Sequence, residues 1–423
     1  MHIFFSGIGG TAIGPLALIA IEAGYEVSGS DKQTSSYIEY LRTRGIDDIQ
    51  VGQDGSQISL THKRNSIDWV VYSSAVAIEN PNHPEIVFAK ENNIRLTKRD
   101  ELLNKIIEDK GQKLIALAGT HGKTTTTAMV IWLMKQFEVP VSYSVGAKIS
   151  FGEMGHFNEK SEYFIYECDE YDRNFLAFKP YLNGITGIAY DHHDIFPTES
   201  SYLQAFSDFV HQSELVVGWQ DDVSKLSYQE NTLSLSPTDP KIEQITLAGK
   251  VNRLDGWLAV QIVHKLTNKP IGQIIENINK FPGVSRRFEK IASGLYSDYA
   301  HTPEKIAGCL QLAREISSNV VVVYEPLTNK RQYEIKDSYN QLFEGVKKLY
   351  WVPSYLTRED PTQIVLTPND LIACMANKEI AKAQELNDDL RIHIQKHLSE
   401  NDLVLCISGG GGGSLDEWLR RNF

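Results

Sequence analysis

Residues 119–125 carry side chains suited to binding the phosphates of a nucleotide. The segment GTHGKT follows a predicted strand at 113–118 and precedes a helix predicted from about residue 124. In such a loop, backbone N–H groups cradle phosphates, the lysine reaches the outer phosphates, and the following hydroxyl binds Mg²⁺. The spacing is shorter than the standard GxxxxGK[ST] loop but meets the same physical needs. The predicted ATP-binding residues are Gly119, Thr120, His121, Gly122, Lys123, Thr124 and Thr125.

Acidic and histidine side chains follow two further predicted strands. Glu167 ends the predicted strand at 163–167, and His192 comes just after the predicted strand at 185–190. In an open parallel sheet, ligands bind outside the carboxyl ends of the strands, where the 119–125 loop also lies. A carboxylate and an imidazole at this edge suit a metal ion that bridges nucleotide and substrate. The predicted metal ligands are Thr124, Glu167 and His192.

A glycine-rich turn follows the first predicted strand, at residues 2–6. The turn satisfies GxGxxG/A, and an aspartate ends the next predicted strand. In a Rossmann unit, the glycines let the backbone approach a pyrophosphate, and the acidic residue binds a ribose hydroxyl. The motif therefore predicts a bound diphosphate nucleotide without identifying it. The residues concerned are Gly7, Gly9, Gly10 and Asp31.

Strands and helices alternate along the chain, which indicates α/β architecture with mostly parallel sheets. The apolar run at 13–21 predicts a buried helix, and the polar segment at 96–112 predicts a second helix that contains a domain boundary. Further strands are predicted at 69–74, 320–324 and 403–408.

The length of 423 residues fits three α/β domains without a long unstructured loop. The formal net charge of −12 argues against a general role in binding nucleic acid, whose phosphate backbone needs a basic surface. The predicted domains are 1–104, 105–283 and 284–423.

The remaining composition favours a cytoplasmic protein. Four cysteines form no CxxC pair, which fits a reducing compartment without disulfides or structural zinc. The N-terminus lacks the basic region of a secretory signal. The apolar run at 13–21 is too short to cross a bilayer, so no membrane insertion is expected.

Two more motifs complete a linked set, SRRFE at 285–289 and SDYAHTP at 297–303. Together with AGTHGKTTT at 118–126, Glu167 and Asp191-His192, they resemble the Mur ligase family in order and spacing across nearly the whole chain. The resemblance implies an ATP-dependent ligase that forms an amide bond on a UDP-N-acetylmuramic acid precursor of peptidoglycan. It also implies three domains. A Rossmann-like N-terminal domain holds the UDP-sugar, a central P-loop-type domain holds ATP, and a C-terminal Rossmann-like domain holds the amino compound.

The resemblance implies a mechanism through an acyl phosphate. Lys123 and Mg²⁺ or Mn²⁺ neutralise the transferring phosphoryl group, while Glu167 and His192 orient the metal and His301 serves catalysis from the C-terminal domain. The other implied ATP contacts are Asn252, Arg287 and Asp298. The other implied substrate contacts are Ser73, Ser74, Tyr299 and Arg331.

Within the family, different segments resemble different branches. GIGG at the first turn, SGSD at 28–31 and SSAV at 73–76 resemble the branch that adds L-alanine to UDP-N-acetylmuramic acid. DEYD at 169–172 and SGGGGGSLDEWL at 408–419 resemble the recycling branch, which attaches L-Ala-γ-D-Glu-meso-diaminopimelate to the same sugar acid. The expected partners are therefore the UDP-sugar and L-alanine, or the murein tripeptide, bound by a monomer or homodimer.

Two departures from the family pattern bear on substrates. Thr328 stands where the L-alanine branch has an arginine, although Arg331 matches a later one. Asp255 replaces an amide in the segment whose Asn252 is expected to meet adenine. The change at Thr328 bears on binding of the carboxylate of L-alanine, and the change at Asp255 bears on binding of adenine.

Three other functions are compatible with parts of the sequence. A nicotinamide-dependent oxidoreductase would use the 7–12 turn but leaves GTHGKT unexplained. A P-loop kinase or NTPase switch would hydrolyse ATP without a UDP-sugar. A binding protein that kept the fold and lost catalysis would account for the altered segments 251–257 and 325–331.

Overall fold

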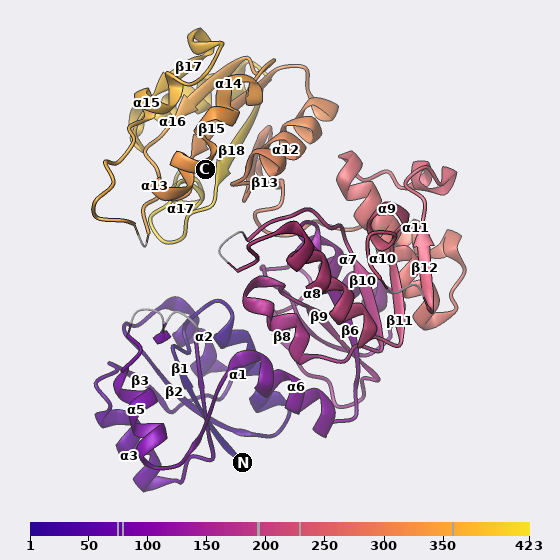
Figure 1. Cartoon of the computed structure of the whole chain (residues 1–423). Coiled ribbons are helices and arrows are strands. Elements are labelled where there is room, and N and C mark those ends of the chain that lie inside the picture. The colour runs from indigo at the N-terminus through magenta and orange to yellow at the C-terminus, as the bar shows by residue number, and fades with distance from the viewer. Residues whose placement is uncertain (74–75, 78–79, 193–194, 228–229, 358) are drawn as a thin grey trace. The chain divides into compact units, whose positions relative to one another are not determined.

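The computed structural model describes residues 1–73, 76–77, 80–192, 195–227, 230–357 and 359–423. Three sheets, each mostly or wholly parallel, alternate with helices along these residues (Figure 1), which confirms the predicted α/β class and its three-domain fold. The chain forms two compact units. The first comprises 1–245 and 255–281, and the second comprises 246–254 and 282–423.

The first sheet is entirely parallel, with the strand order β3-β2-β1-β4-β5. Its central strand reads HIFFS and is buried along its whole length, as expected for a parallel strand covered on both faces. The strands are β1 (His2–Ser6), β2 (Glu26–Asp31), β3 (Ile49–Val51), β4 (Trp69–Tyr72) and β5 (Arg95–Lys98). The helices are α1 (Ile13–Glu22), α2 (Ser36–Thr43), α3 (Ser56–Arg64), α5 (Pro84–Glu91) and α6 (Arg99–Asp109).

The second sheet has the order β12-β11-β10-β6-β9-β7-β8, and only the short β8 runs antiparallel to its neighbour. Strand β6 pairs with β9 on one side and β10 on the other, so the chain order reverses there, where ligands of open α/β sheets bind. The strands are β6 (Lys113–Ala118), β7 (Val141–Ser144), β8 (Gly155–His156), β9 (Tyr163–Glu167), β10 (Leu182–Ile185), β11 (Leu215–Trp219) and β12 (Thr232–Leu235). The helices are α7 (Lys123–Gln136), η1 (Tyr171–Ala177), α8 (Glu199–His211), α9 (Gln220–Val223), η2 (Pro240–Gln244), α10 (Lys250–Thr267) and α11 (Ile271–Ile278).

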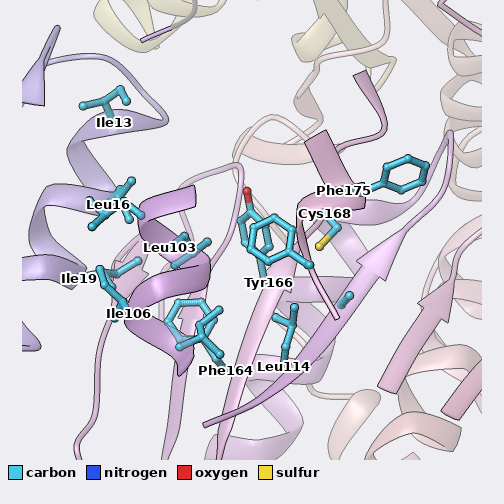
Figure 2. Close-up of a cluster of buried hydrophobic side chains, with 14 of the residues drawn as sticks. Ile13, Leu16, Ile19, Leu103, Ile106, Leu114, Phe164, Tyr166, Cys168 and Phe175 are labelled. Atoms are coloured by element: carbon cyan, nitrogen blue, oxygen red, sulfur yellow. The ribbon is translucent and has the colours of Figure 1, made fainter. Parts of the chain in front are cut away.

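One hydrophobic core joins these two sheets within the first unit. Leu16 of α1 belongs to the same buried cluster as Leu103 of α6 and Phe164 of β9, as Figure 2 shows. All three side chains are at most 4% exposed. Helix α6 therefore packs its apolar face between the first helix of the chain and the second sheet.

The third sheet, in the second unit, has the order β13-β14-β18-β15-β16-β17, with only β13 antiparallel. Apolar strands such as VVVVYE and LVLCIS are fully buried between helices on both sides. The strands are β13 (Glu289–Ala292), β14 (Leu295–Asp298), β15 (Val320–Glu325), β16 (Lys348–Trp351), β17 (Ala381–Ala383) and β18 (Leu403–Ser408). The helices are α12 (Pro303–Ile316), α13 (Asn329–Ile335), η3 (Lys336–Ser338), α14 (Tyr339–Leu342), α15 (Pro368–Ile372), η4 (Lys378–Ile380), α16 (Asp388–Ser399) and α17 (Leu415–Asn422).

Two predicted elements differ from the structure. The strand predicted at 185–190 is wrong, because β10 ends at Ile185 and the chain then leaves the sheet to support the 119–125 loop. The segment predicted as a helix at 96–112 begins as the end of β5 and becomes helical only at Arg99. Apolar content alone does not separate a buried strand from a buried loop, since periodicity is absent in both.

The boundaries 1–104, 105–283 and 284–423 remain predictions. Helix α6 runs through residue 104, so the first predicted boundary falls inside a helix. Among the residues that the structure describes, no helix is both long and apolar enough to cross a membrane.

Candidate active site

Two glycines give the 119–125 loop its shape. Gly119 and Gly122 have φ angles of +142° and +80°, a region that favours glycine. A Cβ atom at Gly119 would lie 2.4 Å from Oγ1 of Thr186, so this position has no room for a side chain. Helix α7 starts directly after the turn, and its first N–H groups are free of intrahelical partners, as an anion site requires.

The segment 186–189 fixes the other side of the loop. The Thr120 N–H donates to the carbonyl oxygen of Gly187 at 2.8 Å, and the Thr120 hydroxyl donates to that of Ala189 at 2.7 Å. The same hydroxyl lies 2.8 Å from the phenol oxygen of the buried Tyr202. These contacts hold the loop in place before any ligand binds.

Lys123 forms a buried ion pair beside the loop. Its amine donates to the carbonyl oxygen of Gly119 at 2.7 Å and to the carboxylate of Glu170. Burial lowers the pKa of Lys123, but the charges of Glu170 and Asp169 outweigh it, so the net shift is upward and the amine stays charged. Burial likewise raises the pKa of Glu170, while Lys123 and His192 bring it below its usual value.

Thr124 and Glu167 lie together, as the sequence predicts. The Thr124 hydroxyl donates to Oε1 of Glu167 at 2.8 Å, and the N–H of Gly146 donates to Oε2 at 2.8 Å. A hydroxyl and a carboxylate oxygen at this separation match the hard oxygen ligands that Mg²⁺ prefers. The pair therefore fits a divalent ion at the phosphate end of the loop.

His192 faces Glu170. Its Nε2 atom lies 3.5 Å from Oε1 of Glu170, and its backbone φ of +58° is unusual for a non-glycine residue. Burial lowers the pKa of His192, but Glu170 and Asp191 raise it further, so the net shift is upward. The proposed role of His192 as a metal ligand remains a prediction, since its imidazole is placed against Glu170.

The first glycine turn is closed by the aspartate that ends β2. Asp31 accepts a hydrogen bond from the N–H of Gly9 at 2.8 Å, and Gly7 accepts one from the N–H of Gly10 at 3.1 Å. Ser73 donates its N–H to Ser6 at the same edge of the sheet. The structure thus brings Gly7, Gly9, Gly10, Asp31 and Ser73 together, whereas Ser74 lies outside the described residues.

A pocket of about 260 Å³ lies between the end of the first glycine turn and the carboxyl end of β9, within the first unit. Thr11 and Ala12, at the end of the first glycine turn, line it together with Glu167. Arg99 lines it as well, with its Nη2 atom 3.8 Å from Asp169. Arg99 is the only cationic side chain among the described residues that line this pocket. It therefore offers a binding partner for an anionic group.

A second group of predicted residues lies within the second unit. The guanidinium carbons of Arg286 and Arg287 lie 4.6 and 4.9 Å from the ring centroid of Tyr299. Asp298 accepts hydrogen bonds from two backbone N–H groups, those of residues 288 and 300, at 2.8 and 2.7 Å. Its carboxylate therefore stabilises the turn after β14. Burial raises its pKa against the opposing charge of Arg287.

His301 is an uncharged imidazole at physiological pH. Burial, followed by the charge of Lys305, lowers its pKa to about 3, and its Nδ1 lies 2.9 Å from the carbonyl oxygen of Tyr299. The charges of Arg331 and Arg287 also lower this pKa. The structure thus groups Arg287, Asp298, Tyr299 and His301 around the carboxyl end of β14, and Arg331 lies on α13.

Two more predicted positions lie in the second unit. Thr328 accepts a hydrogen bond from the N–H of Arg331 and caps α13, with a φ of +54°. Asn252 donates its side-chain amide to the carbonyl oxygen of Ala248 at 2.8 Å. This bond uses one N–H of the amide, so its second N–H and its Oδ1 atom could still meet an adenine.

Sequence reasoning did not single out Glu170 or Arg99. Glu170 belongs to the acidic cluster that follows β9, and its complete burial marks it among those carboxylates. Arg99 begins a polar helix, and nothing in its neighbours reveals that it lines a pocket formed by two sheets. The sequence shows that Glu170 lies in an acidic cluster but not that it is the buried member, and it gives no signal for Arg99.

A glycine-shaped phosphate loop and strand-end carboxylates at the switch point of a parallel sheet define a class of enzymes that use a nucleoside triphosphate. Family models of two domains match this chain: "Mur ligase family, catalytic domain" over residues 2–110 and "Mur ligase middle domain" over 117–236. The chain belongs to the Mur ligase family, and it is an ATP-dependent ligase that forms amide bonds.

Similar proteins match the chain over nearly its whole length. A UDP-N-acetylmuramate–L-alanine ligase from Clostridium acetobutylicum is 30% identical over 96% of this chain and 95% of its own. A UDP-N-acetylmuramate–L-alanine ligase from Clostridium beijerinckii is also 30% identical, with the same coverage.

Two crystal structures share the fold. The UDP-N-acetylmuramate–alanine ligase of Thermotoga maritima has a TM-score of 0.75 at 23% identity, covering 100% of this chain and 98% of its own. A murein peptide ligase from Psychrobacter arcticus has a TM-score of 0.64 at 21% identity, with the same coverage.

Proposed function

We propose that this protein joins L-alanine to the lactyl carboxylate of UDP-N-acetylmuramic acid, with ATP as the energy source, in peptidoglycan synthesis. The observation that carries this proposal is the match, over 96% of the chain, to relatives that bear this activity in their names. The Lys123 loop and its strand-end acids supply the chemistry that such a reaction requires. We assign the protein to the cytoplasm, where UDP-sugars are made, as a monomer or homodimer.

The phosphate loop is the proposed site of ATP. Gly119 and Gly122 leave the backbone open to phosphate, and the charged Lys123 lies at the start of α7. Thr124 and Glu167 are the residues that would hold Mg²⁺ or Mn²⁺. Such an ion, when bound, withdraws charge from the phosphoryl oxygens and screens them from the attacking carboxylate.

The proposed reaction has two steps on the sugar acid. In the first, the lactyl carboxylate attacks the γ-phosphate of ATP while Lys123 stabilises the charge on the transferring group. The bond between the γ-phosphorus and the bridging oxygen breaks, ADP leaves, and the sugar acid becomes an acyl phosphate, in which phosphate is a good leaving group. In the second, the amine attacks the acyl carbon and phosphate departs. We assign His301, which is uncharged, to hold the amine, and we assign Arg331 to the carboxylate of the amino substrate.

Attachment of the murein tripeptide is the second candidate, and Thr328 favours it. At this position the L-alanine branch has an arginine, whereas here a neutral hydroxyl caps α13. A carboxylate clamp for free L-alanine would therefore rest on Arg331 and its neighbours. The peptide has an N-terminal L-alanine with no free carboxylate at that residue, so it would not need the missing cation.

Phosphate release from ATP tests the proposal and separates the candidates. We expect release when UDP-N-acetylmuramic acid and L-alanine are both present, and background release when either is omitted. Release with the tripeptide but not with L-alanine would assign the recycling reaction. Release with neither amine would overturn both candidates. Release with ATP alone at the full rate would instead indicate an NTPase.

Arg99→Ala is predicted to weaken binding of the UDP-sugar. Arg99 is a cationic side chain that lines the pocket between the first glycine turn and Glu167, and the UDP-sugar carries a diphosphate and a carboxylate. Loss of one charge-assisted hydrogen bond costs about 1.5–3 kcal/mol, or roughly a 10- to 100-fold higher KM for the UDP-sugar. Steady-state kinetics measure this change, and KM for ATP should stay within about twofold.

Arg64→Ala is the matched control for this prediction. Arg64 lies at the end of α3 with its side chain 64% exposed, paired with Asp48 on the surface. Its removal should leave both KM values unchanged, since exposed ion pairs contribute little. An unchanged KM for the UDP-sugar in the Arg99 variant would remove this residue from the sugar site.

A further inference from the structure

Asp255 lies directly beneath the phosphate loop, and none of the proposed steps uses it. Its side chain is 4% exposed and projects from α10 against the turn that precedes α7. A Cβ atom built on Gly122 would lie 2.7 Å from Oδ1 and 3.1 Å from Oδ2 of Asp255. The carboxyl group therefore fills the space under the glycine whose backbone shapes the loop.

This carboxyl group has no ionic partner among the described residues. Burial raises the pKa of Asp255 to about 8, and interaction with the Thr126 hydroxyl opposes the rise. The titratable side chains of the adjoining turn are His121 and Lys123, and the amine of Lys123 is bound to Gly119 and Glu170 instead. An ionised Asp255 would thus be a buried, unpaired anion.

An anion at this position would oppose nucleotide binding. At the proposed ATP site, the N–H groups at the start of α7 would face the phosphates, which are strongly negative. Two like charges within several ångströms repel strongly when the medium between them is protein rather than water. A protonated carboxyl carries no charge and can donate a hydrogen bond while it fills the same space.

We propose that Asp255 is a positioning residue of the phosphate loop and that the loop binds nucleotide only while the Asp255 carboxyl is protonated. The proposal rests on the proposed use of ATP at this loop and on no assumption about the amine substrate. On this proposal, ionisation of the Asp255 carboxyl is the event that weakens nucleotide binding as the pH rises. A low pH and a bound nucleotide then both favour the loop with Asp255 protonated.

Equilibrium binding of Mg·ADP at different pH values tests the proposal. The neutral fraction of a carboxyl with a pKa of about 8 falls from about nine tenths at pH 7 to about one tenth at pH 9. If only the neutral form binds, the dissociation constant measured by calorimetry should rise about tenfold over this range. The nucleotide itself does not titrate here, since phosphate monoesters lose their last proton at a pKa of about 6.

Asp255→Asn separates this effect from other titrations. The amide has the shape of the protonated acid and no charge, so the variant should bind Mg·ADP as tightly as the wild type at pH 7. At pH 9 it should bind about tenfold more tightly than the wild type. The variant keeps His192 and Lys123 unchanged, so the ratio of the two dissociation constants isolates Asp255. Asp208→Asn, an exposed change on α8, should retain the wild-type pH profile.

Three outcomes would overturn the proposal. These are a wild-type dissociation constant that stays constant from pH 7 to 9, an equal rise in the Asp255→Asn variant, and a large loss of affinity in that variant at pH 7. The last would mean that the carboxylate anion is required. If the ligase assay showed no phosphate release with L-alanine or with the tripeptide, the proposed function would be refuted. The binding result would stand, because the Mg·ADP experiment contains no sugar or amine.

Discussion

Lys123→Ala is expected to lower kcat by about 10³-fold or more, because no other described cation is bound to the backbone of the phosphate loop. The amine neutralises charge that develops on the transferring phosphoryl group, and water cannot replace a fixed positive charge in a buried site. Phosphate release with UDP-N-acetylmuramic acid and the active amine measures the effect. Circular dichroism should show that the variant retains its secondary structure.

The loss of Lys123 also removes the partner of the buried Glu170. That carboxylate keeps His192 as a neighbour, so its pKa should rise rather than the fold fail. Lys265→Ala provides the matched control, since Lys265 is an exposed lysine on α10. Turnover within about twofold of the wild type in the Lys123 variant would refute the assignment of the loop.

Glu167→Gln is expected to lower activity at least about 100-fold at limiting Mg²⁺. Glu167 contacts the Thr124 hydroxyl through one oxygen and the N–H of Gly146 through the other. The amide keeps the size of the side chain but loses the charge that attracts a divalent ion. The dependence of kcat on Mg²⁺ concentration is the informative measurement, and its midpoint should move to higher concentration.

Glu162→Gln is the matched control, because it removes a carboxylate charge at the other end of β9. Glu162 immediately precedes β9, at the opposite end of the strand from Glu167, and pairs with Lys113 on the surface. Its replacement should leave both turnover and Mg²⁺ dependence unchanged. An unaltered Mg²⁺ midpoint in the Glu167 variant would show that the metal is held elsewhere.

The parts of the site that depend on local sequence were predictable. Gly119, Gly122 and Lys123 act through the turn that they themselves form, so their spacing is enough to predict a phosphate loop. Glu167 was predictable because a parallel sheet brings the ends of its strands to one edge. The pairing of Thr124 with Glu167 follows from these two facts and from the adjacency of β6 and β9.

The parts that depend on packing were not predictable. The residues after Ile185 are apolar and were predicted to extend the strand, yet they turn away to support Thr120. The choice of Glu170 as the partner of Lys123 depends on which carboxylate the fold buries, and sequence alone does not rank the neighbours. Arg99 lines a pocket that forms only where segments of the first two sheets pack together, and no local sequence pattern predicts that packing.

The core in Figure 2 has a consequence for how the chain can come apart. Leu16, Leu103 and Phe164 share one apolar interior, so neither of the first two sheets can unfold without exposing the other's apolar surface. These sheets therefore melt as one cooperative block, whereas the second unit has hydrophobic clusters of its own. Unfolding of the unit formed by 246–254 and 282–423 would therefore leave the core shared by the first two sheets covered.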